Sequence, residues 1–491
     1  MNIWGVSAGG HDAAIAVVND NNIVWASHSE RYSRVKNDDV LNQQLVDAAA
    51  IHGTPDLIVW HENTTNKRLR ELYAGQFKDA FSKGPRHQLK TLGLGNIKFE
   101  SVSHHHSHAA AGYYTSGFKS AAVLVIDAVG EWETLSIWHG VGDSLVKIKS
   151  VRYPNSIGLF YTAMTQRCGF KPNEEEYIMM GLAALGDKQK YLKLIEAELI
   201  EQTDTFPFYR CRFNHHRGFA SWHTEITDRE NLAAAAQEVF TQVVVKISKW
   251  IHTYVNKRNL VISGGCALNC VTNTAIAKTW RWTNIWIMPN PGDAGNSLGA
   301  ALAQQGKMTV WNGPYLGDSI EGRYPTISLF KELSAGRIVG VANGRAEFGP
   351  RALGNRSLLG DPRLPDIQQR MNVVKNRENF RPFAPVVMAE HAKQYFENIV
   401  QDLSYMQFAV RCKDPAKFPG ITHADDTSRV QTVTARQNPG LYNLLKLWYA
   451  STGCPMLVNT SLNVKGQPMV NTVADAKHFE NIYGIRVFTR E

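Results

Sequence analysis

The chain has 491 residues, of which 44% are hydrophobic and 20% charged, a balance typical of a globular protein with two or three domains. No apolar run is long enough to span a membrane, and the start lacks the basic leader of a secretory signal, so we expect a cytoplasmic protein with no membrane partner. The formal net charge of +9 favours an anionic partner, and most of the surplus follows residue 335, where 20 Lys and Arg face 13 Asp and Glu. Six scattered cysteines match neither a zinc ribbon nor a disulfide framework.

The first 30 residues are predicted to form three short strands. Their apolar segments cover residues 3–6, 13–18 and 23–26, and Gly9-Gly10 marks a tight turn between the first two. A strand, a glycine turn and a second strand also open actin-like ATPases, in which backbone N–H groups of the turn hold phosphate or substrate. Most glycine turns are only turns, however. Residues 39–51, with helical periodicity, follow.

Four histidines lie within the five residues His104-His105-His106-Ser107-His108, just before an alanine-rich stretch. On a helix, His104 and His108 are one turn apart and share a face, which is the spacing that lets one metal ion take two ligands. The alternative is a polar loop or an expression tag. Tags sit at chain ends, and this run is internal, so the pattern favours a metal site.

Two aspartates follow predicted strands and complete a candidate ligand set. Residues 121–126 form an apolar strand that ends at Asp127, and the strand at residues 285–288 leads into a turn that contains Asp293. The ends of such strands are favoured places for ligand carboxylates, although Asp127 could also be a turn or capping residue. Together with His104 and His108 they make a two-histidine, two-carboxylate set that suits Fe(II), Mn(II) or Zn(II), among which the sequence does not choose.

A long amphipathic helix is predicted over residues 232–255, followed by a strand at residues 260–262. A glycine turn and a further helix come next. A strand, a glycine turn and a helix form a plausible nucleotide-binding element, here with Gly264, Gly265 and Asn269 as its binding residues.

A domain boundary is predicted within residues 306–335, which Gly, Pro and polar residues interrupt, so we divide the chain into domains 1–320 and 321–491. After a strand at residues 338–342, cations alternate with glycine and proline. Guanidinium groups bind polyphosphates in bidentate fashion, so this segment favours a phosphate site, the alternative being a solvated basic loop. The cations concerned are Arg351, Arg356, Lys375, Arg377 and Arg381, to which the later segment 457–466 adds Asn459 and Ser461.

In this order the motifs resemble those of the NodU/CmcH-type O-carbamoyltransferase family over nearly the whole chain. The N-terminal stretches are GHDAA (10–14), ERYSRVK (30–36), HHHSH (104–108), DAVGE (127–131), MGLA (180–183) and SGGCALN (263–269). The C-terminal stretches are EFGPRALGNRS (347–357), RPFAP (381–385), RVQTV (429–433) and NTS (459–461).

The resemblance implies an α/β protein with a duplicated actin-like ATPase domain, similar to tRNA threonylcarbamoyl transferases, and a C-terminal YrdC-like domain. In that family, ATP and carbamoyl phosphate yield a carbamoyl-adenylate in the C-terminal domain, and a hydroxyl attacks it at the N-terminal metal site, with iron as the metal we expect. Carried over by position, His104, His108, Asp127 and Asp293 would hold the metal. Arg351, Lys375, Arg381 and Ser461 would bind the activated carbamoyl group.

By the same resemblance, His11 would deprotonate the acceptor, a step for which a neutral histidine is a suitable base. The alternative is a structural histidine in a glycine-rich turn. One departure concerns the position two residues before Met180, where the family often has lysine and this chain has Ile178, which leaves a phosphate contact there in doubt.

The acceptor hydroxyl is the least determined part of the prediction. Aromatic residues and cations alternate over residues 206–219, and residues 67–98 are rich in Lys and Arg. Such patterns suit nucleic acid, or else a strand with one aromatic face beside a solvated basic helix. We hypothesise a hydroxymethylated DNA base such as 5-hydroxymethylcytosine, contacted by Arg210, Arg212, Phe213 and Arg217.

Two rival readings remain. One is O-carbamoylation of a small natural product, sugar or nucleoside. The other is a non-enzymatic actin-like nucleotide switch or nucleic-acid-binding protein, which would need neither the metal set nor the arginine-rich domain. The sequence leaves the oligomeric state open, a homodimer included.

Overall fold

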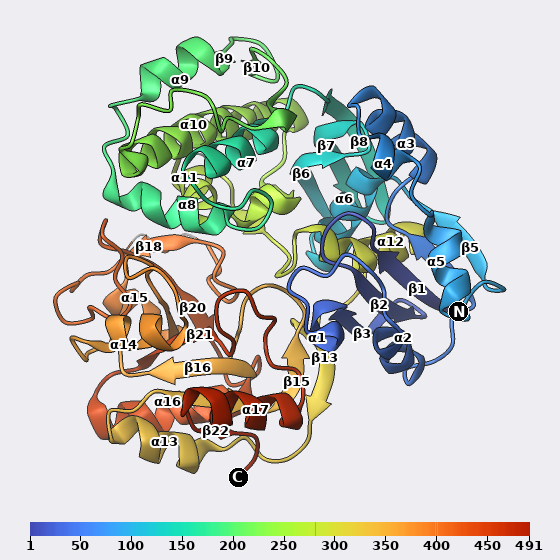
Figure 1. Ribbon diagram of the computed structural model, residues 1–491. Helices are drawn as coiled ribbons and strands as arrows, with labels where there is room; N and C mark the ends of the chain where they lie inside the picture. Colours follow the sequence, from blue (N-terminus) through green and yellow to red (C-terminus); the bar gives the residue numbers. More distant parts are fainter. Residues whose placement is uncertain (280, 398, 400) are drawn as a thin grey trace. The chain divides into compact units, whose positions relative to one another are not determined.

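The structure is a computed structural model that describes residues 1–279, 281–397, 399 and 401–491. The chain divides into two compact units (Figure 1). The first consists of Met1–Ser29 and Asn37–Asn312, and the second of Glu30–Lys36 and Gly313–Glu491. Compared with the division that we drew from the sequence, the second unit therefore begins eight residues earlier and also takes a short segment from the N-terminal part of the chain.

Two five-stranded sheets with the same topology form the first unit, in the orders β3-β2-β1-β4-β5 and β8-β7-β6-β11-β12. In each, the first strand pairs antiparallel with the second, the second antiparallel with the third, and the two remaining strands run parallel to the first. The first sheet contains β1 (Asn2–Ser7), β2 (Ala14–Asn19), β3 (Asn22–His28), β4 (Leu57–Trp60) and β5 (Lys98–Ser101). The second contains β6 (Ser120–Gly130), β7 (Glu133–Val141), β8 (Ser144–Arg152), β11 (Asn259–Ser263) and β12 (Asn284–Trp286). This repeat confirms the duplicated actin-like fold.

Helices α6 (His104–Thr115) and α12 (Asn296–Gln305) pack on each other between the two sheets, α12 against the first and α6 against the second. The contact is close because α6 carries Ala109–Ala111 and α12 carries Gly299, Ala300 and Ala301, all buried. Asp127 lies within β6, on which α6 packs, and Asp293 lies in the short 3-10 helix η4 (Asp293–Gly295) that directly precedes α12. The layering therefore brings the histidine run and both carboxylates to one place.

Helix α10 (Arg229–Val255) is the long amphipathic helix that the spacing predicts, and its Phe240, Val244, Ile247 and Ile251 are buried. It packs with α7 (Ile157–Arg167) against β6 of the second sheet. The other helices of the first unit are α2 (Gln43–Ala50), α3 (Thr64–Tyr73), α4 (Phe77–Ala80), α5 (Pro85–Thr91), α8 (Glu176–Leu182), α9 (Leu192–Glu198) and α11 (Cys270–Thr279). Strands β9 (Ile200–Gln202) and β10 (Tyr209–Cys211) form a separate pair.

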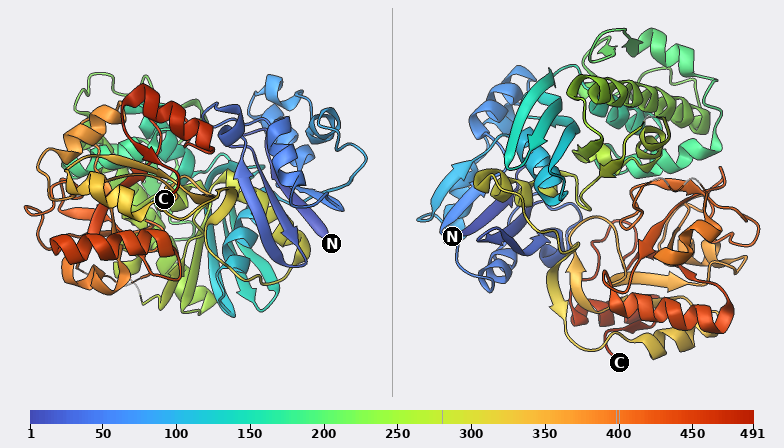
Figure 2. Two further views of the ribbon diagram at one scale, coloured as in Figure 1. Left: turned by 90° about the horizontal axis from the view of Figure 1, so that it is seen from below. Right: turned by 180° about the vertical axis from the view of Figure 1, so that it is seen from behind.

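The second unit is built on a six-stranded mixed sheet in the order β20-β17-β21-β16-β14-β22. Its strands are β14 (Val339–Ala342), β16 (Arg356–Gly360), β17 (Ala384–Met388), β20 (Gln431–Val433), β21 (Met456–Ser461) and β22 (Val487–Phe488). Two separate strand pairs are formed by β13 (Tyr315–Ile320) with β15 (Gly344–Glu347) and by β18 (Ala409–Arg411) with β19 (Thr427–Arg429). Its helices are α13 (Thr326–Ser334), α14 (Ile367–Val374), α15 (Ala392–Tyr395), α16 (Pro439–Thr452) and α17 (Val473–Tyr483). Helices α13 and α16 pack on each other and on the sheet (Figure 2), so the expected α/β class holds for this unit too.

The segment Glu30–Lys36, which includes α1 (Glu30–Ser33), belongs to the second unit although it lies in the N-terminal part of the chain. Arg34 donates hydrogen bonds to the carbonyls of Met469 (2.8 Å) and Pro468 (3.2 Å). Tyr32 donates its hydroxyl to Asp318, 2.8 Å away. The second unit is thus completed by a piece of chain that is about 280 residues away in sequence from its main segment. Among the described residues, no helix combines the length and apolarity needed to cross a bilayer.

Candidate functional site

Helix α6 aims two of its four histidines at the same point. The Nε2 atoms of His104 and His108 lie 3.1 Å apart, and both side chains are buried. The other two turn elsewhere, His105 to the hydroxyl of Ser136 at 2.8 Å and His106 to a stack on Trp138. The i, i+4 spacing therefore selects the pair that was predicted.

Asp127 and Asp293 meet this histidine pair. Asp127 Oδ2 lies 3.0 Å from His104 Nε2 and 3.6 Å from His108 Nε2. Asp293 Oδ1, at the start of the 3-10 helix η4 (Asp293–Gly295), lies 3.5 Å from His104 Nε2 and 3.3 Å from His108 Nε2. We call these four residues the His/Asp cage.

The spacing of the cage fits a transition-metal ion. Its four ligand atoms all lie within 4.8 Å of one another. Ligands about 2.1 Å from a metal are about 3.0 Å apart at octahedral angles and about 3.4 Å apart at tetrahedral angles. Of the five separations given above, the shortest is the 3.0 Å between His104 and Asp127, and the longest is the 3.6 Å between His108 and Asp127. Two imidazoles and two carboxylates are a donor set that Fe(II), Mn(II) and Zn(II) accept.

The electrostatics of the cage call for positive charge. Burial and the neighbouring Asp293 raise the pKa of Asp127, but hydrogen bonds with His104 and His108 outweigh them and hold that pKa well below its ordinary value. Burial lowers the pKa of His104, yet the two carboxylates raise it well above its ordinary value. The buried Asp127 and the half-buried Asp293 thus draw cationic charge between them, which either protons on the imidazoles or a divalent metal ion can supply.

Two glycines allow the backbone approaches that shape the cage. A Cβ on Gly130 would lie 2.1 Å from Cδ2 of His104, so only glycine leaves room for that ring. Gly264 has a φ of +89°, and a Cβ there would lie 2.1 Å from the carbonyl oxygen of Ile126, next to Asp127. The following N–H, that of Gly265, donates to Asp127 Oδ1 at 3.3 Å. The glycine turn after β11 therefore positions a cage carboxylate.

The three residues of the predicted N-terminal nucleotide element, Gly264, Gly265 and Asn269, all have partners within the protein. Gly264 donates its N–H to the carbonyl of Pro291, and Gly265 serves Asp127. Asn269 accepts from the backbone N–H of Thr272, at the start of α11, and donates to Gln237 at 3.0 Å. In the structure the turn therefore supports the cage and Asn269 supports the start of α11, while their part in nucleotide binding stays a prediction.

Two further residues hold the cage and were missed by sequence reasoning. Glu131 accepts hydrogen bonds from the backbone N–H of His104 (3.1 Å) and of Asn63 (2.5 Å), which anchors the start of α6. Asn296 lies three residues after Asp293, and its Nδ2 is 3.0 Å from His108 Nε2. Adjacency to Asp127-Ala128-Val129-Gly130 and the i+3 spacing from Asp293 are the signals that could have pointed to them.

A second group, His61, Glu62 and His104, also lies close enough to hold an ion. Glu62, however, is already paired with Lys67, whose Nζ lies 2.7 Å from the carboxylate. Burial lowers the pKa of His61 to about 4, so this imidazole is neutral at ordinary pH. We read the group as a buried surround of the cage.

His11 lies in the turn between β1 and β2 and forms a pair with Asp12. Its Nδ1 is 3.0 Å from Asp12 Oδ2, and its Nε2 is buried without a hydrogen-bond partner among the described residues. Asp12 has a φ of +50°, an uncommon backbone conformation for a residue with a side chain. Burial lowers the pKa of His11, but Asp12, with a smaller contribution from Asp293, raises it to about 9. Ile178, the residue at which the chain departs from the family pattern, is fully buried on α8.

In the second unit, Lys375 and Ser461 come together as expected. The Nζ of Lys375 donates to the carbonyl (2.6 Å) and hydroxyl (3.0 Å) of Ser461 and to Asn463 Oδ1 (2.6 Å). Burial, followed by Arg377 and Arg381, lowers the pKa of Lys375 well below its ordinary value. Asn459, on the same strand β21, donates to Gln431 at 2.7 Å and to the carbonyl of Ala352 at 3.1 Å.

Two of the predicted phosphate ligands have partners within the second unit. Arg356 is 0% exposed, and its guanidinium donates to the backbone carbonyls of five residues: Asp318, Asn343, Gly344, Asn355 and Asn471. Arg377 stacks on Phe383, with its guanidinium carbon 4.0 Å from the ring centroid, and donates to Asn372 at 2.7 Å. Because the donors of Arg356 are already used, we remove this residue from the ligand set, while Arg351, Arg377 and Arg381, all half-buried, stay predicted phosphate ligands.

The segment predicted to contact the acceptor divides into two parts. Tyr209, His215 and Phe219 are buried. The side chains of the predicted acceptor residues are exposed, namely Arg210, Arg212, Phe213 and Arg217. Three rings of the segment thus pack inward and its arginines face solvent, while Phe213 is a ring that remains exposed.

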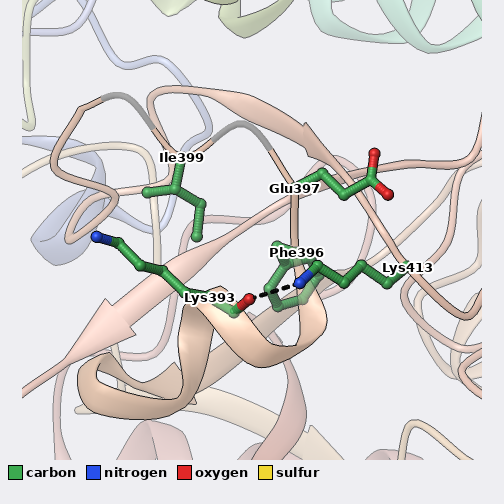
Figure 3. A pocket seen from close by; sticks show the side chains of 5 residues that line it. All are labelled: Lys393, Phe396, Glu397, Ile399 and Lys413. Atoms are coloured by element: carbon green, nitrogen blue, oxygen red, sulfur yellow. Dashed lines mark hydrogen bonds between the residues drawn. The ribbon is translucent and has the colours of Figure 1, made fainter.

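The surface of the second unit also has an open depression lined by Lys393, Phe396, Glu397, Ile399 and Lys413 (Figure 3). Lys413 donates to the carbonyl of Lys393 at 2.8 Å across it. None of the predicted site residues lines this depression, so it has no part in the site.

Comparison with known proteins adds independent findings. A family described as Carbamoyltransferase N-terminus matches residues 57–302, and one described as Carbamoyltransferase C-terminus matches residues 330–488. The chain is 35% identical to the uncharacterized protein sll1178 of Synechocystis, over 96% of this chain and 93% of that protein. It is 32% identical to the nodulation protein NolO of Bradyrhizobium diazoefficiens, over 76% and 75%. It is 27% identical to the 3'-hydroxymethylcephem-O-carbamoyltransferase of Streptomyces clavuligerus, over 95% and 94%.

Proposed function

The chain belongs to the carbamoyltransferase family, and from this premise we propose that it is an ATP-dependent O-carbamoyltransferase. It would take the carbamoyl group of carbamoyl phosphate, activate it as a carbamoyl-adenylate, and transfer it to an acceptor hydroxyl. The observation that carries the proposal is the convergence of His104, His108, Asp127 and Asp293 within ligand distance of one another, with His11 and Asp12 as an acid–base pair in the same unit.

Activation is needed because the carbonyl carbon of a carbamate is a poor electrophile. An adenylate supplies a good leaving group, and the negative charge of its phosphates must be neutralised. Arg351, Lys375 and Arg381, with the hydroxyl of Ser461, would carry out that neutralisation in the second unit. The Nζ of Lys375 already donates to Ser461 and Asn463, so a bound phosphate would have to exchange with these partners for its hydrogen bonds.

The His/Asp cage would hold a divalent metal ion, for which we propose Fe(II), with Mn(II) and Zn(II) as the alternatives to test. When bound, such an ion supplies Lewis-acid polarisation of a carbonyl or phosphoryl oxygen. The chain's own residues set the geometry: Glu131 anchors α6, Gly265 holds Asp127, and Asn296 contacts His108.

His11 would act as the general base, with Asp12 as the residue that orients it. Asp12 beside Nδ1 leaves Nε2 to accept the proton of the acceptor hydroxyl, as in other histidine–aspartate pairs. The acceptor oxygen then bonds to the carbamoyl carbon, and AMP leaves. A histidine must be neutral to accept a proton, and with a pKa near 9 His11 is largely protonated at neutral pH, so the rate is expected to rise toward alkaline pH.

For the acceptor we propose a hydroxymethylated DNA base such as 5-hydroxymethylcytosine. The net charge of +9 and the exposed Arg210, Arg212, Phe213 and Arg217 support an anionic, base-containing acceptor. The competing acceptor is a small-molecule hydroxyl, as in the cephem substrate that names one relative. The family membership favours either reading over a non-enzymatic nucleotide switch.

The decisive experiment incubates the purified protein with ATP, carbamoyl phosphate and an acceptor panel: hydroxymethylated DNA, the matching nucleoside, unmodified DNA and an aminoglycoside. We expect AMP release and a mass gain of one carbamoyl group per hydroxymethylated base, both abolished by a chelator and restored by a divalent metal. Carbamoylation of the small molecules alone would overturn the DNA acceptor. Full turnover after complete metal removal would overturn the role of the cage.

A further inference from the structure

Three aromatic side chains, two from α10 and one from the segment before β10, surround one lysine on the first unit. The Nζ of Lys149, on β8, lies 4.9 Å from the ring centroid of Phe206, 5.1 Å from that of Trp250 and 5.9 Å from that of Tyr254. Trp250 and Tyr254, one turn apart on α10, stack with their centroids 4.4 Å apart and their planes at 17°. Tyr254 is 57% exposed, so the stack ends in a ring that faces solvent. We call Phe206, Trp250, Tyr254 and Lys149 the aromatic platform.

The sequence on and after the C-terminal half of α10 is rich in positive charge. No Asp or Glu occurs from residue 239 to residue 292, while Lys246, Lys249, Lys257 and Arg258 lie on or directly after the C-terminal half of α10. Of these, Lys246 donates to Gln202, a neutral partner, at 2.6 Å. A stretch of this length with cations only is complementary to a polyanion.

We propose that the aromatic platform is a binding surface for single-stranded or unpaired DNA, on which a base stacks against Tyr254 and the flanking cations contact the phosphates. This inference rests on the proposed nucleic-acid acceptor and deepens it, because it places the DNA contact on α10 and β8. Among residues 210–217, which the sequence suggested, Phe213 is the one exposed ring beside the arginines, whereas the platform presents a stacked pair of rings beside cations.

The chemistry favours nucleic acid over other polyanions. Stacked rings beside cations bind successive bases and their phosphates, and every base has a π-face, so such sites tolerate any sequence. An acidic peptide would satisfy the cations but leaves the exposed face of Tyr254 unused. Lys149 also stabilises the platform itself, since an ammonium over ring faces holds Phe206 and Trp250 at fixed positions.

The test uses the full-length protein and a fluorescent single-stranded oligonucleotide without hydroxymethyl groups, titrated by anisotropy at several salt concentrations. Loss of one stacking ring weakens binding by roughly fivefold to a hundredfold, so Tyr254→Ser should fall in this range. Arg258→Gln, which removes one of the flanking cations, should lower the dependence of log affinity on log salt by about 0.7, the value for one phosphate contact on a single strand. Lys446→Gln, which alters an exposed lysine of the second unit, should change neither quantity.

Photocrosslinking with a 5-bromouracil oligonucleotide, mapped by mass spectrometry, should label Trp250 or Tyr254. Trp250→Phe is the second variant, in case Tyr254→Ser disturbs α10, because it replaces the indole and still keeps a ring at this position. The proposal is overturned if the oligonucleotide does not bind, if Tyr254→Ser binds as tightly as the wild type, or if base-free polyphosphate competes as well as DNA of the same charge. Carbamoylation of the free hydroxymethylated nucleoside by the same variants is measured in parallel, so a failure of the platform is distinguished from a failure of the proposed activity.

Discussion

The histidines of α6 and the arginines of the second unit are both clusters that the sequence predicts to bind ligands, but they have different surroundings. His104 and His108 face each other and two carboxylates, and their Nε2 atoms point into one common space. The guanidinium of Arg356 is surrounded by backbone carbonyls that use its donors. Both sites are buried and charged. What separates a functional site from a structural one is whether the polar atoms converge on a common space or are already paired.

The comparison also shows why a buried arginine can stand beside a ligand site without being part of it. Glu347 accepts the backbone N–H groups of Leu353 (2.7 Å), Asn355 (2.9 Å) and Arg356 (3.3 Å), which folds the arginine-rich loop tightly. Arg356 secures the same loop from its carbonyl side. A loop that is held in this way can present Arg351 and other groups to phosphate without spending the energy of ordering on binding.

The largest expected effect comes from breaking the cage. His108→Ala removes one metal ligand, and since loss of even an outer-sphere partner costs about tenfold to a hundredfold in metal affinity, we expect a loss beyond a hundredfold in both metal content and turnover. Inductively coupled plasma mass spectrometry and the carbamoylation assay measure the two. His106→Gln on the same helix, whose ring stacks on Trp138, is the matched control and should keep its metal. A metal-loaded, active His108→Ala protein would contradict the assignment.

Arg356→Lys sharpens the structural side of the comparison. An ammonium has three donors and cannot reach the carbonyls that the planar guanidinium serves, so buried acceptors lose partners. We expect the free energy of unfolding to fall by about 2–4 kcal/mol, measured by urea denaturation. The KM for carbamoyl phosphate in the protein that remains folded should stay near the wild-type value. A raised KM with unchanged stability would return Arg356 to the ligand set.

Arg381→Gln should behave in the opposite way. A charge-assisted hydrogen bond to phosphate is worth about 1.5–3 kcal/mol, which corresponds to a decrease of roughly tenfold to a hundredfold in kcat/KM for carbamoyl phosphate or ATP. Because Arg381 is half-buried and its ion-pair partner Glu378 is 3.4 Å away, the free energy of unfolding should change by less than about 1 kcal/mol. Equal losses of stability in Arg381→Gln and Arg356→Lys would contradict the distinction between Arg381 as a ligand residue and Arg356 as a structural one.

The smallest expected effect concerns His11 and its partner. In the wild type, activity should rise with pH until His11 loses its proton near pH 9. Asp12→Asn removes the charge that raises this pKa and leaves the burial that lowers it, so the rising limb should move to lower pH, toward or below about 6.5. The measurement is kcat/KM against pH for both proteins. A limb that stays in place would show that the titrating group is not His11.

Much of the fold follows from local sequence. The strand segments at residues 3–6, 13–18 and 23–26 lie within β1, β2 and β3 or overlap them, and the helix predicted over residues 232–255 is α10. These succeed because apolar alternation and helical spacing depend on near neighbours. The helix predicted over residues 39–51 is shorter in the structure, where α2 begins only after its cap, Asn42.

By itself the sequence determined that His104 and His108 share a helical face, that two aspartates follow strands, and that the motifs stand in carbamoyltransferase order. Tertiary structure alone decided that both aspartates reach the same two imidazoles, that Glu30–Lys36 completes the second unit, and that Arg356 is held by carbonyls. The physical reason is range. Spacing along a helix or strand is set by the local backbone, whereas the partners of a buried charge come from residues far away in sequence, which only the folded chain brings within hydrogen-bond distance.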